Sequence, residues 1–592
     1  MLRIPTDPLR KYLTDQIKQQ VQTLLPSHLV EQGLADLYWQ LTNPPDTNMG
    51  DLAFGCFQLS KILKKNPAQI AIEIKSRMSP NEKISRIEAV GSYVNFSFTE
   101  KFIGEELLES ILSGSFFQVK LTENSPFTMI EFSQPNTHKE LHVGHMRNAC
   151  LGDAVVRLHR YAGYKVISST FPGDVGTHVA KCLWYMKYHN QEPIPIEGRG
   201  EWLGKMYSKA HIKLEDEVGS PQEQKNREQL TFILKQLETK EGEFYELWKQ
   251  TRQWSVDLMK RVYNWTGIEF DKWYWESDVD SDSIKYIKKL FEEGFLVRSE
   301  NAIGMDLEAE KLGFCLLLKS DGTGLYATKD VELARRKFQE FKIEKSIYVV
   351  DLRQALHFKQ VFRVLEKIGF PQAKDCYHLQ YNFVELPDGP MSSRKGNIVA
   401  LTELIHRMEE AVKTNYLKRY QNEWSGAEIN LVASQVAQGA IKYGMLRMDT
   451  NKKIVFDMTE WLKIEGESGP FVQYSSARIN SLCKKFDYKR SEFLPGSVDW
   501  SLLIHTAEHK LMQLLMDFHN VVIGATQNYK PALLCTYLYE VAKRFNLFYH
   551  ECSIGNAGAE ELKRSRLALS QATGEVLKKG LALLGVAAPE RM

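Results

Sequence analysis

The fold of this chain is decided by the stretch EFSQPNTHKELHVGHMRN at residues 131–148. An apolar segment at 127–133 leads into it with the pattern of a buried strand, and a helical pattern follows as far as Ala162, before the natural helix stop Gly163. A second strand-like segment, 165–171, completes a β-α-β unit. The sequence therefore predicts a parallel α/β sheet, with this stretch at a crossover from strand to helix.

Two histidines stand at this crossover, His142 and His145, with Gly144 between them. The carboxyl end of a parallel strand and the amino end of a helix form a site that attracts phosphate. Two imidazoles there can donate hydrogen bonds to phosphate oxygens while charge builds on the α-phosphorus, without a covalent intermediate. The alternatives are a structural pair and a metal site, although no nearby cysteine or third histidine completes a closed set of metal ligands and the glutamate of a zinc-protease helix is absent.

The composition is that of a large globular protein. The chain has 592 residues, 43% hydrophobic and 25% charged, which predicts three or more domains. Its net charge of +2 neither favours nor excludes a nucleic-acid partner. The eight cysteines include no Cys-x-x-Cys pair, which fits a reducing cytoplasm. Without an export signal or a run of about 18 apolar residues, we expect a cytoplasmic chain that does not span a membrane.

The patterning along the chain divides it into three parts. Residues 1–118 predict a small α+β appendage, with helical patterns at 13–25 and 62–74 and a strand at 93–98. Residues 119–455 predict the α/β part, interrupted by a helical insertion at about 185–285, after which the alternation of strands and helices resumes near Phe314. Residues 456–592 predict an all-α part. Its core includes a stripe at helix spacing: Leu511, Leu514, Leu515, Phe518 and Val522.

The stretch at 131–148 closely resembles the signature of class I arginyl-tRNA synthetases. Further motifs of that family occur in the same order and extend to the last residue: 173–177, 321–323, 326–330, 348–350, Gln354, 471–474, 477–479, 584–586 and 589–592. The resemblance implies a Rossmann-type catalytic domain, an amino-terminal appendage that touches the tRNA elbow, and a helical anticodon-binding domain. It also implies formation of arginyl-adenylate and pyrophosphate from L-arginine and ATP, then transfer of arginine to the terminal adenosine of tRNA(Arg) for protein biosynthesis. In this family, tRNA binds before arginine is activated.

One phosphate-binding loop of the family is altered in this chain. Class I synthetases carry a Lys-Met-Ser-Lys-Ser loop, and Pro390 and Ser393 stand here where the two lysines are expected. Taken alone, residues 390–397 are also compatible with an ordinary surface turn. By resemblance, ATP is bound by Met391, Ser392 and Ser393, and Arg394 and Lys395 supply catalytic cations. We expect Lys139, three residues before His142, to reach the phosphates in place of the missing lysine, as a catalytic and ATP-binding residue together with His142, Gly144 and His145.

The arginine site follows from the same resemblance. Glu131, Tyr326 and Asp330 would surround the guanidinium, and Asn136 and Gln354 would hold the α-amino end. Carboxylates suit a planar cation that carries five donors. Glu131 also has an independent argument, because a carboxylate inside an apolar strand needs a partner, which a buried cationic substrate would provide. The alternative for Asp330 is an ordinary charge near a helix amino terminus.

The remaining expectations concern partners. Tyr474 is the predicted tRNA-binding residue, and further candidates for RNA contact are Phe545, Phe548, Tyr549, Lys484, Lys485 and Arg490. We expect Mg²⁺ to be bound through the ATP phosphates and not by protein ligands. A monomer is expected, with a dimer left open. Two other functions stay open: a small nucleotidyltransferase with the same histidine motif, and a non-catalytic RNA-binding descendant of a synthetase.

Overall fold

The computed structural model describes residues 4–387 and 400–592. At its centre lies a five-stranded sheet of β5 (Thr128–Glu131), β6 (Val166–Thr170), β7 (Lys272–Trp273), β11 (Lys345–Asp351) and β12 (Cys376–Tyr381). The strands are all parallel, in the order β12-β11-β5-β6-β7. The chain moves outward from β5 in both directions, and such a switch point opens a crevice at the carboxyl ends of the strands. The predicted parallel α/β fold is confirmed.

Helix α8 (Val143–Ala162) forms the predicted crossover between β5 and β6. It ends at Gly163, whose φ of 97° lies in the left-handed region that favours glycine. Close packing on the sheet depends on another glycine. A Cβ built on Gly152 would lie 2.1 Å from the ring of Phe132, so only glycine lets this helix approach the end of β5 so closely.

The predicted helical insertion has different limits in the structure. Four helices pack around a shared apolar cluster: α9 (Thr177–Tyr188), α10 (Arg199–Asp216), α11 (Gln222–Thr239) and α12 (Glu243–Thr266). The chain then returns to the central sheet as β7, so the predicted range of 185–285 includes a strand of that sheet. A strand of two residues is too short to leave a periodic signal in the sequence.

The alternation of strands and helices resumes at Phe314, as expected, but its first strand is not part of the central parallel sheet. Residues Phe314–Leu318 do form a strand, β10, but it belongs to a separate antiparallel sheet with β9 (Ala302–Asp306) and β8 (Val297–Ser299). This sheet lies between α13 (Glu276–Glu292) and α14 (Tyr326–Phe341) in the chain. The parallel sheet resumes only at β11, and α15 (Ala355–Lys367) connects that strand to β12.

The amino-terminal part is a four-stranded antiparallel sheet in the order β1-β2-β4-β3 with helices on it. The predicted strand at 93–98 is β4 (Tyr93–Phe98), and the first predicted helix is α1 (Pro8–Leu24). The second helical pattern is divided in two, because Asn66 caps a new helix that begins at Pro67. The other elements are α2 (Val30–Leu34), α3 (Leu37–Gln40), β1 (Leu41–Thr42), β2 (Leu52–Gly55), α4 (Phe57–Leu63), α5 (Pro67–Ser76), β3 (Ile84–Val90), α6 (Glu100–Ile103) and α7 (Glu109–Ser113).

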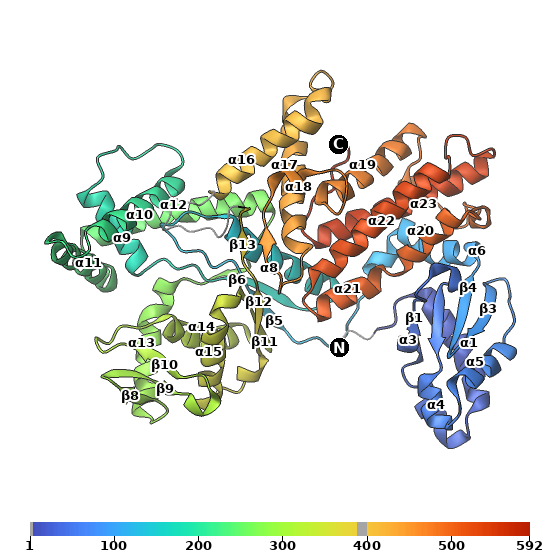
Figure 1. The fold of residues 1–592 in the computed structure, drawn as a ribbon, viewed down its shortest axis with the longest axis horizontal. Coiled ribbons are helices and arrows are strands. Elements are labelled where there is room, and N and C mark those ends of the chain that lie inside the picture. The colour runs from blue at the N-terminus through green and yellow to red at the C-terminus, as the bar shows by residue number, and fades with distance from the viewer. Residues whose placement is uncertain (1–3, 388–399) are drawn as a thin grey trace.

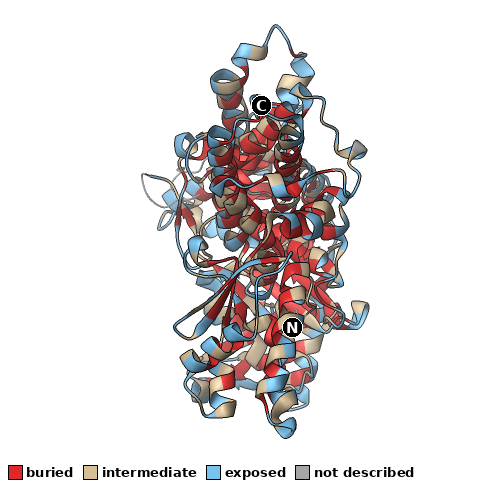
Figure 2. Cartoon of the chain, turned by 90° about the vertical axis from the view of Figure 1, so that its right-hand side faces the viewer, coloured by how far each residue is buried: buried red, intermediate tan, exposed pale blue. Residues whose placement is uncertain are grey.

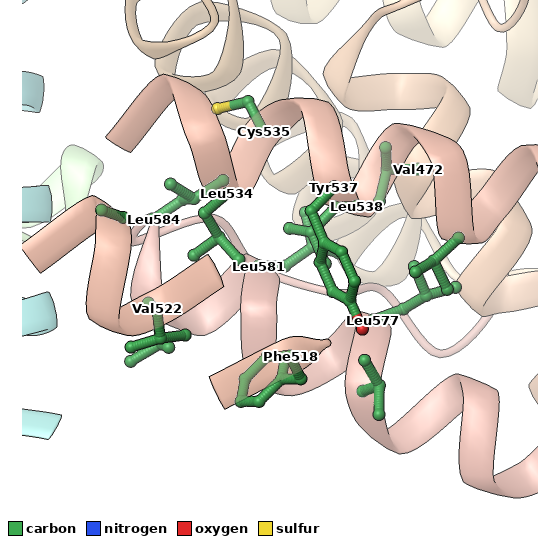
Figure 3. Close-up of a cluster of buried hydrophobic side chains, with 14 of the residues drawn as sticks. Val472, Phe518, Val522, Leu534, Cys535, Tyr537, Leu538, Leu577, Leu581 and Leu584 are labelled. Atoms are coloured by element: carbon green, nitrogen blue, oxygen red, sulfur yellow. The ribbon is translucent and has the colours of Figure 1, made fainter. Parts of the chain in front are cut away.

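The carboxy-terminal part is helical, as predicted, and lies beside the amino-terminal part (Figure 1). Four residues of the predicted stripe, Leu511, Leu515, Phe518 and Val522, are fully buried, although they lie on two helices instead of one. Phe518 and Val522 are part of the buried apolar cluster shown in Figure 3. The elements after β12 are β13 (Val384–Glu385), α16 (Leu401–Val412), α17 (Gly426–Leu446), β14 (Ile454–Val455), α18 (Met458–Leu462), α19 (Gly469–Lys485), α20 (Thr506–Met516), α21 (Phe518–Gln527), α22 (Pro531–Glu551) and α23 (Glu560–Leu583).

Segments of buried residues run through the interior of the molecule (Figure 2), and one apolar cluster extends from Leu9 to Met592 across all three parts. None of the described helices is both long and apolar enough to cross a bilayer.

A charged contact joins the first and last parts of the chain. Nε2 of His509, on α20, lies 3.0 Å from Asp51, and its Nδ1 lies 3.2 Å from Glu100 on α6. Burial acts to lower the pKa of His509, but the hydrogen bonds to the two carboxylates outweigh burial and raise this pKa to about 9. The imidazolium therefore stabilises the contact at neutral pH.

We predict that replacing His509 by glutamine removes a pH-dependent part of stability. Because the folded-state pKa is raised, the stabilisation is complete below about pH 6.5 and is lost as the pH rises through 9, with a magnitude on the order of 2 kcal/mol. Urea unfolding at about pH 7 and pH 10 measures the difference between the two proteins. A difference that is the same at both pH values would contradict the charged contact.

Candidate active site

A cavity of about 930 Å³ opens at the carboxyl ends of the central strands. The ends of β5, β6, β11 and β12 contribute Glu131, Phe171, Asp351 and Tyr381 to its wall. The wall also contains eight of the residues predicted from the sequence: His142, Gly144, His145, Glu131, Asn136, Tyr326, Asp330 and Gln354. The fold thus brings three of the predicted phosphate-binding residues and all five predicted arginine-binding residues into one cavity.

His142 and His145 cap the amino end of α8 reciprocally. The backbone N–H of Gly144 donates to Nδ1 of His142, and the backbone N–H of His142 donates to Nδ1 of His145, each over 3.1 Å. The centroids of the two imidazole rings are 3.9 Å apart. Side chains that satisfy the free N–H groups of a first helical turn stabilise that turn, so the cap holds both imidazoles in place.

This cap also determines which ring nitrogen carries the proton. In a neutral imidazole, a nitrogen that accepts a hydrogen bond leaves the proton on the other nitrogen, so Nε2–H is the donor in both rings. Burial, followed by the charges of Arg353 and Lys139, lowers the pKa of His142 to about 4. Burial first, and then His142 and Lys139, hold the pKa of His145 well below 6.5. At neutral pH the pair therefore acts as two uncharged hydrogen-bond donors.

The loop before the histidines is held in a strained backbone conformation. Ser133 and His138 have φ values of 55° and 59°, in a region that non-glycine residues rarely adopt. Oδ1 of Asn148 accepts from the N–H of Ser133, while Nδ2 of Asn148 donates to the carbonyl of Val349 on β11. The imidazole of His138 is buried between Thr137 and Thr251, so this third histidine of the motif is structural.

The carboxylates of the cavity have cationic partners within the protein. Oδ2 of Asp330 lies 2.6 Å from Nε2 of His357. Glu276 lies 3.1 Å from Nζ of Lys329, and burial raises its pKa to about 7 although Lys329 acts to lower it. Neither His357 nor Glu276 was singled out from the sequence, because each lies in the first turn of an ordinary amphipathic helix.

The expectation that Glu131 needs a cationic substrate as its partner is wrong. Its carboxylate forms an ion pair with Lys337, a fully buried residue of α14. The protein itself therefore supplies the partner that the strand carboxylate needs, and a cationic substrate is not required for that purpose. Glu131 still lines the cavity.

Three predicted residues are placed by features of the local backbone. Tyr326 begins α14 and is 63% exposed. Gln354 ends a short 3₁₀ turn that follows β11. Asn136 forms an isolated bridge with Gly173, where a Cβ would lie 2.3 Å from the Asn136 Oδ1. The glycine of the motif at 173–177 therefore makes room for the Asn136 side chain.

Lys139 is not part of the cavity wall. Its ammonium lies 5.0 Å from the ring centroid of Tyr207, on α10, although its charge reaches both histidines of the cap. The other predicted phosphate-binding residues, Met391, Ser392, Ser393, Arg394 and Lys395, lie outside the described residues. The described chain resumes at Ala400, which bridges to His142.

The residues predicted to contact RNA differ in how far they are exposed to solvent. Tyr474 is half-buried, and the guanidinium of Arg478 lies 4.9 Å from its ring and 5.4 Å from the ring of Tyr549. Lys484 and Lys485 are exposed. Two candidates require correction, because Phe545 and Phe548 are fully buried in the helical core. Arg490 is partly exposed and contacts the Leu112 carbonyl and Glu575. A phenylalanine ring that is buried in the core cannot stack on a base.

Comparison with known proteins identifies the family. Residues 107–458 match the family model described as tRNA synthetases class I (R), catalytic domain. Residues 11–98 match the arginyl tRNA synthetase N terminal domain, and residues 472–592 match the DALR anticodon binding domain. An arginine–tRNA ligase of Bdellovibrio bacteriovorus is 59% identical over 589 residues, covering 100% of both chains. The chain belongs to the arginyl-tRNA synthetase family.

Other members of the arginyl-tRNA synthetase family agree with this assignment. The arginine–tRNA ligase of Clostridium botulinum is 34% identical and covers 97% of this chain and 100% of its own. The solved Thermus thermophilus arginyl-tRNA synthetase superimposes with a TM-score of 0.77 at 26% identity, covering 99% of this chain and 100% of its own. The predicted family, fold and aminoacyl-tRNA ligase activity are confirmed.

Proposed function

We propose that this arginine–tRNA ligase forms arginyl-adenylate in the cavity beside α8. The observation that carries the proposal is the presence, in one cavity, of two neutral imidazole donors and of the carboxylates Glu276 and Asp330. Neutral donors at a helix amino terminus suit phosphate oxygens. Carboxylates suit a guanidinium. The two substrates would therefore meet between these groups.

Arginine is oriented by residues at opposite ends of its length. Asp330, Tyr326 and Glu131 surround the guanidinium, and we add Glu276, because this buried carboxyl also lines the cavity. Asn136 and Gln354 hold the α-amino end. A charged substrate that is desolvated in this way depends strongly on each carboxylate that it contacts.

The first reaction is an in-line displacement at the α-phosphorus of ATP. A carboxylate oxygen of arginine forms the new P–O bond, the bond to the bridging oxygen breaks, and pyrophosphate leaves with its electron pair. The Nε2–H groups of His142 and His145 donate to phosphate oxygens as charge builds on them. Lys139, Arg394 and Lys395 supply positive charge for the leaving pyrophosphate, with Met391, Ser392, Ser393 and Gly144 completing the ATP-binding residues.

Mg²⁺ would reach the cavity bound to the phosphates of ATP. This ion prefers oxygen ligands and keeps several water molecules when it accompanies a nucleotide. Within residues 4–387 and 400–592, no three His, Cys, Asp or Glu side chains gather in a way that could hold a metal ion. When bound, the ion offsets negative charge on the phosphates.

In the second reaction, a hydroxyl of the terminal adenosine of tRNA(Arg) attacks the arginyl carbonyl carbon, and AMP leaves. Tyr474 contacts the tRNA from the helical part, where Arg478 and Tyr549 extend the same surface. The enzyme is proposed to act as a monomer. The eight free thiols suit the reducing cytoplasm.

We predict that replacing Asp330 by asparagine lowers kcat/KM for arginine by roughly 10²–10³-fold, because a desolvated guanidinium loses a charged partner. The KM for ATP changes little. Arginine-dependent pyrophosphate exchange in the presence of tRNA measures both constants. The matched control is Asp282→Asn, which removes a half-exposed carboxylate of α13 that pairs with Arg336 of α14. Kinetics near wild type in the Asp330 variant would show that the guanidinium binds elsewhere.

We also predict that Lys139→Ala slows adenylate formation by at least about tenfold while the KM for arginine stays within about threefold, since the lost charge acts on phosphate. Pyrophosphate exchange with tRNA present provides the measurement. Lys205→Ala, at an exposed position of α10, is the matched control. An activation rate that is unchanged in the Lys139 variant would remove this residue from the mechanism.

A further inference from the structure

The carboxylates of the cavity differ in the kind of cation that each one contacts. Among the described residues, four carboxylates line the cavity, and three of these contact a lysine or an arginine: Glu131 with Lys337, Glu276 with Lys329, and Asp351 with Arg353. Asp330 instead contacts His357, at the beginning of α15. Its partner is thus the one cation of this set that can lose its charge near neutral pH.

We propose that His357 is a positioning residue that sets the charge of the arginine pocket. As a neutral imidazole, it orients Asp330 through an Nε2–H hydrogen bond and leaves the carboxylate charge available to the guanidinium. As an imidazolium, it neutralises that charge itself. This inference rests on the proposed function, in which Asp330 contacts the guanidinium of arginine.

The position of the pair supports this role. The side chains of His357 and Asp330 are 22% and 15% exposed, and both line the cavity, so a ligand there can reach the pair. The separation of 2.6 Å is that of a strong, charge-assisted hydrogen bond. Because His357 follows Gln354 by three residues, the same turn of chain also carries the residue proposed to hold the α-amino group.

The surroundings allow His357 to change its charge under physiological conditions. The titratable groups around it are Asp330 on α14 and His378 on β12, and Asp351 at the end of β11 acts in turn on His378. Burial acts to lower the pKa of His357, but the hydrogen bond to Asp330 and its charge raise it above 6.5. Burial lowers the pKa of His378. A cation entering the pocket would therefore displace a proton from His357 before any other imidazole nearby.

The consequence is a coupling between arginine binding and proton release. A guanidinium keeps its charge at every physiological pH, so arginine binds the form with a neutral imidazole and favours loss of the His357 proton. Arginine affinity falls as the pH decreases through the His357 pKa. Protonation of Glu276, with a pKa of about 7, acts in the same direction. The two contributions must therefore be separated by substitution.

Calorimetric titration of arginine into the full chain, with and without tRNA, measures this coupling. Titrations in buffers of different ionisation enthalpy give the number of protons released. His357→Gln keeps an amide donor in place of Nε2–H but cannot gain a proton. At about pH 8 we expect this variant to bind arginine within about threefold of wild type, and between about pH 8 and 6 it should lose much less affinity than wild type. It should also release fewer protons.

His357→Ala removes both the donor and the charge, so its affinity should fall about tenfold or more even at about pH 8. A side chain with only a structural role would lower affinity equally at every pH and would not change proton release. His28→Asn removes an exposed imidazole of the amino-terminal part and shows whether the loss of any imidazole changes proton release. Its proton release should equal that of wild type.

Two failures are distinguishable in this design. If Asp330→Asn leaves arginine affinity unchanged, the proposed location of the guanidinium is wrong, and the inference fails with it. If Asp330→Asn abolishes binding while His357→Gln retains the pH dependence and proton release of wild type, only the inference about His357 is overturned.

Discussion

The backbone hydrogen bonds that Nδ1 of His142 and Nδ1 of His145 accept at the start of α8 are the constraint on which the rest of the site depends. Each Nδ1 is used to cap α8, so each Nε2 keeps its proton and remains a donor. Two neighbouring features of the fold keep the pair in this arrangement. Gly152 brings α8 onto the sheet, and Asn148 connects the strained turn at Ser133 to β11. The donors are thus positioned before any phosphate binds, which is what electrostatic catalysis requires.

The neutral donors explain how charge is distributed across the cavity. The imidazoles near the helix terminus are held neutral by burial and by neighbouring cations, so their role depends on hydrogen-bond direction. At the proposed arginine end of the cavity, charge is instead provided by carboxylates that are balanced by internal cations. A carboxylate that is paired with a cation is easier to bury than a single charge. We propose that each of these carboxylates can exchange its internal cation for the guanidinium of arginine. In our proposal, the pairing of Asp330 with a histidine makes arginine binding dependent on pH.

Local signals in the sequence predicted the elements that a regular pattern or a motif defines. The β-α-β unit, the stop at Gly163 and the convergence of Asn136, Asp330 and Gln354 on one cavity all follow from such signals. Features that depend on distant contacts could not be predicted. Nothing near Glu131 indicates that Lys337 will pair with it. Burial of Phe545 and Phe548 depends on which side of α22 faces the core, which an aromatic-rich helix does not reveal.

The rate of adenylate formation in a His142→Asn variant tests the central claim most directly. Asparagine is a good helix N-cap, so α8 keeps its first turn while the Nε2–H donor is lost. Rapid-quench measurement with saturating arginine, ATP and tRNA should give a rate lower by roughly 10²–10³-fold with little change in thermal stability. A rate close to wild type would contradict the account, because the imidazole would then serve only to cap the helix.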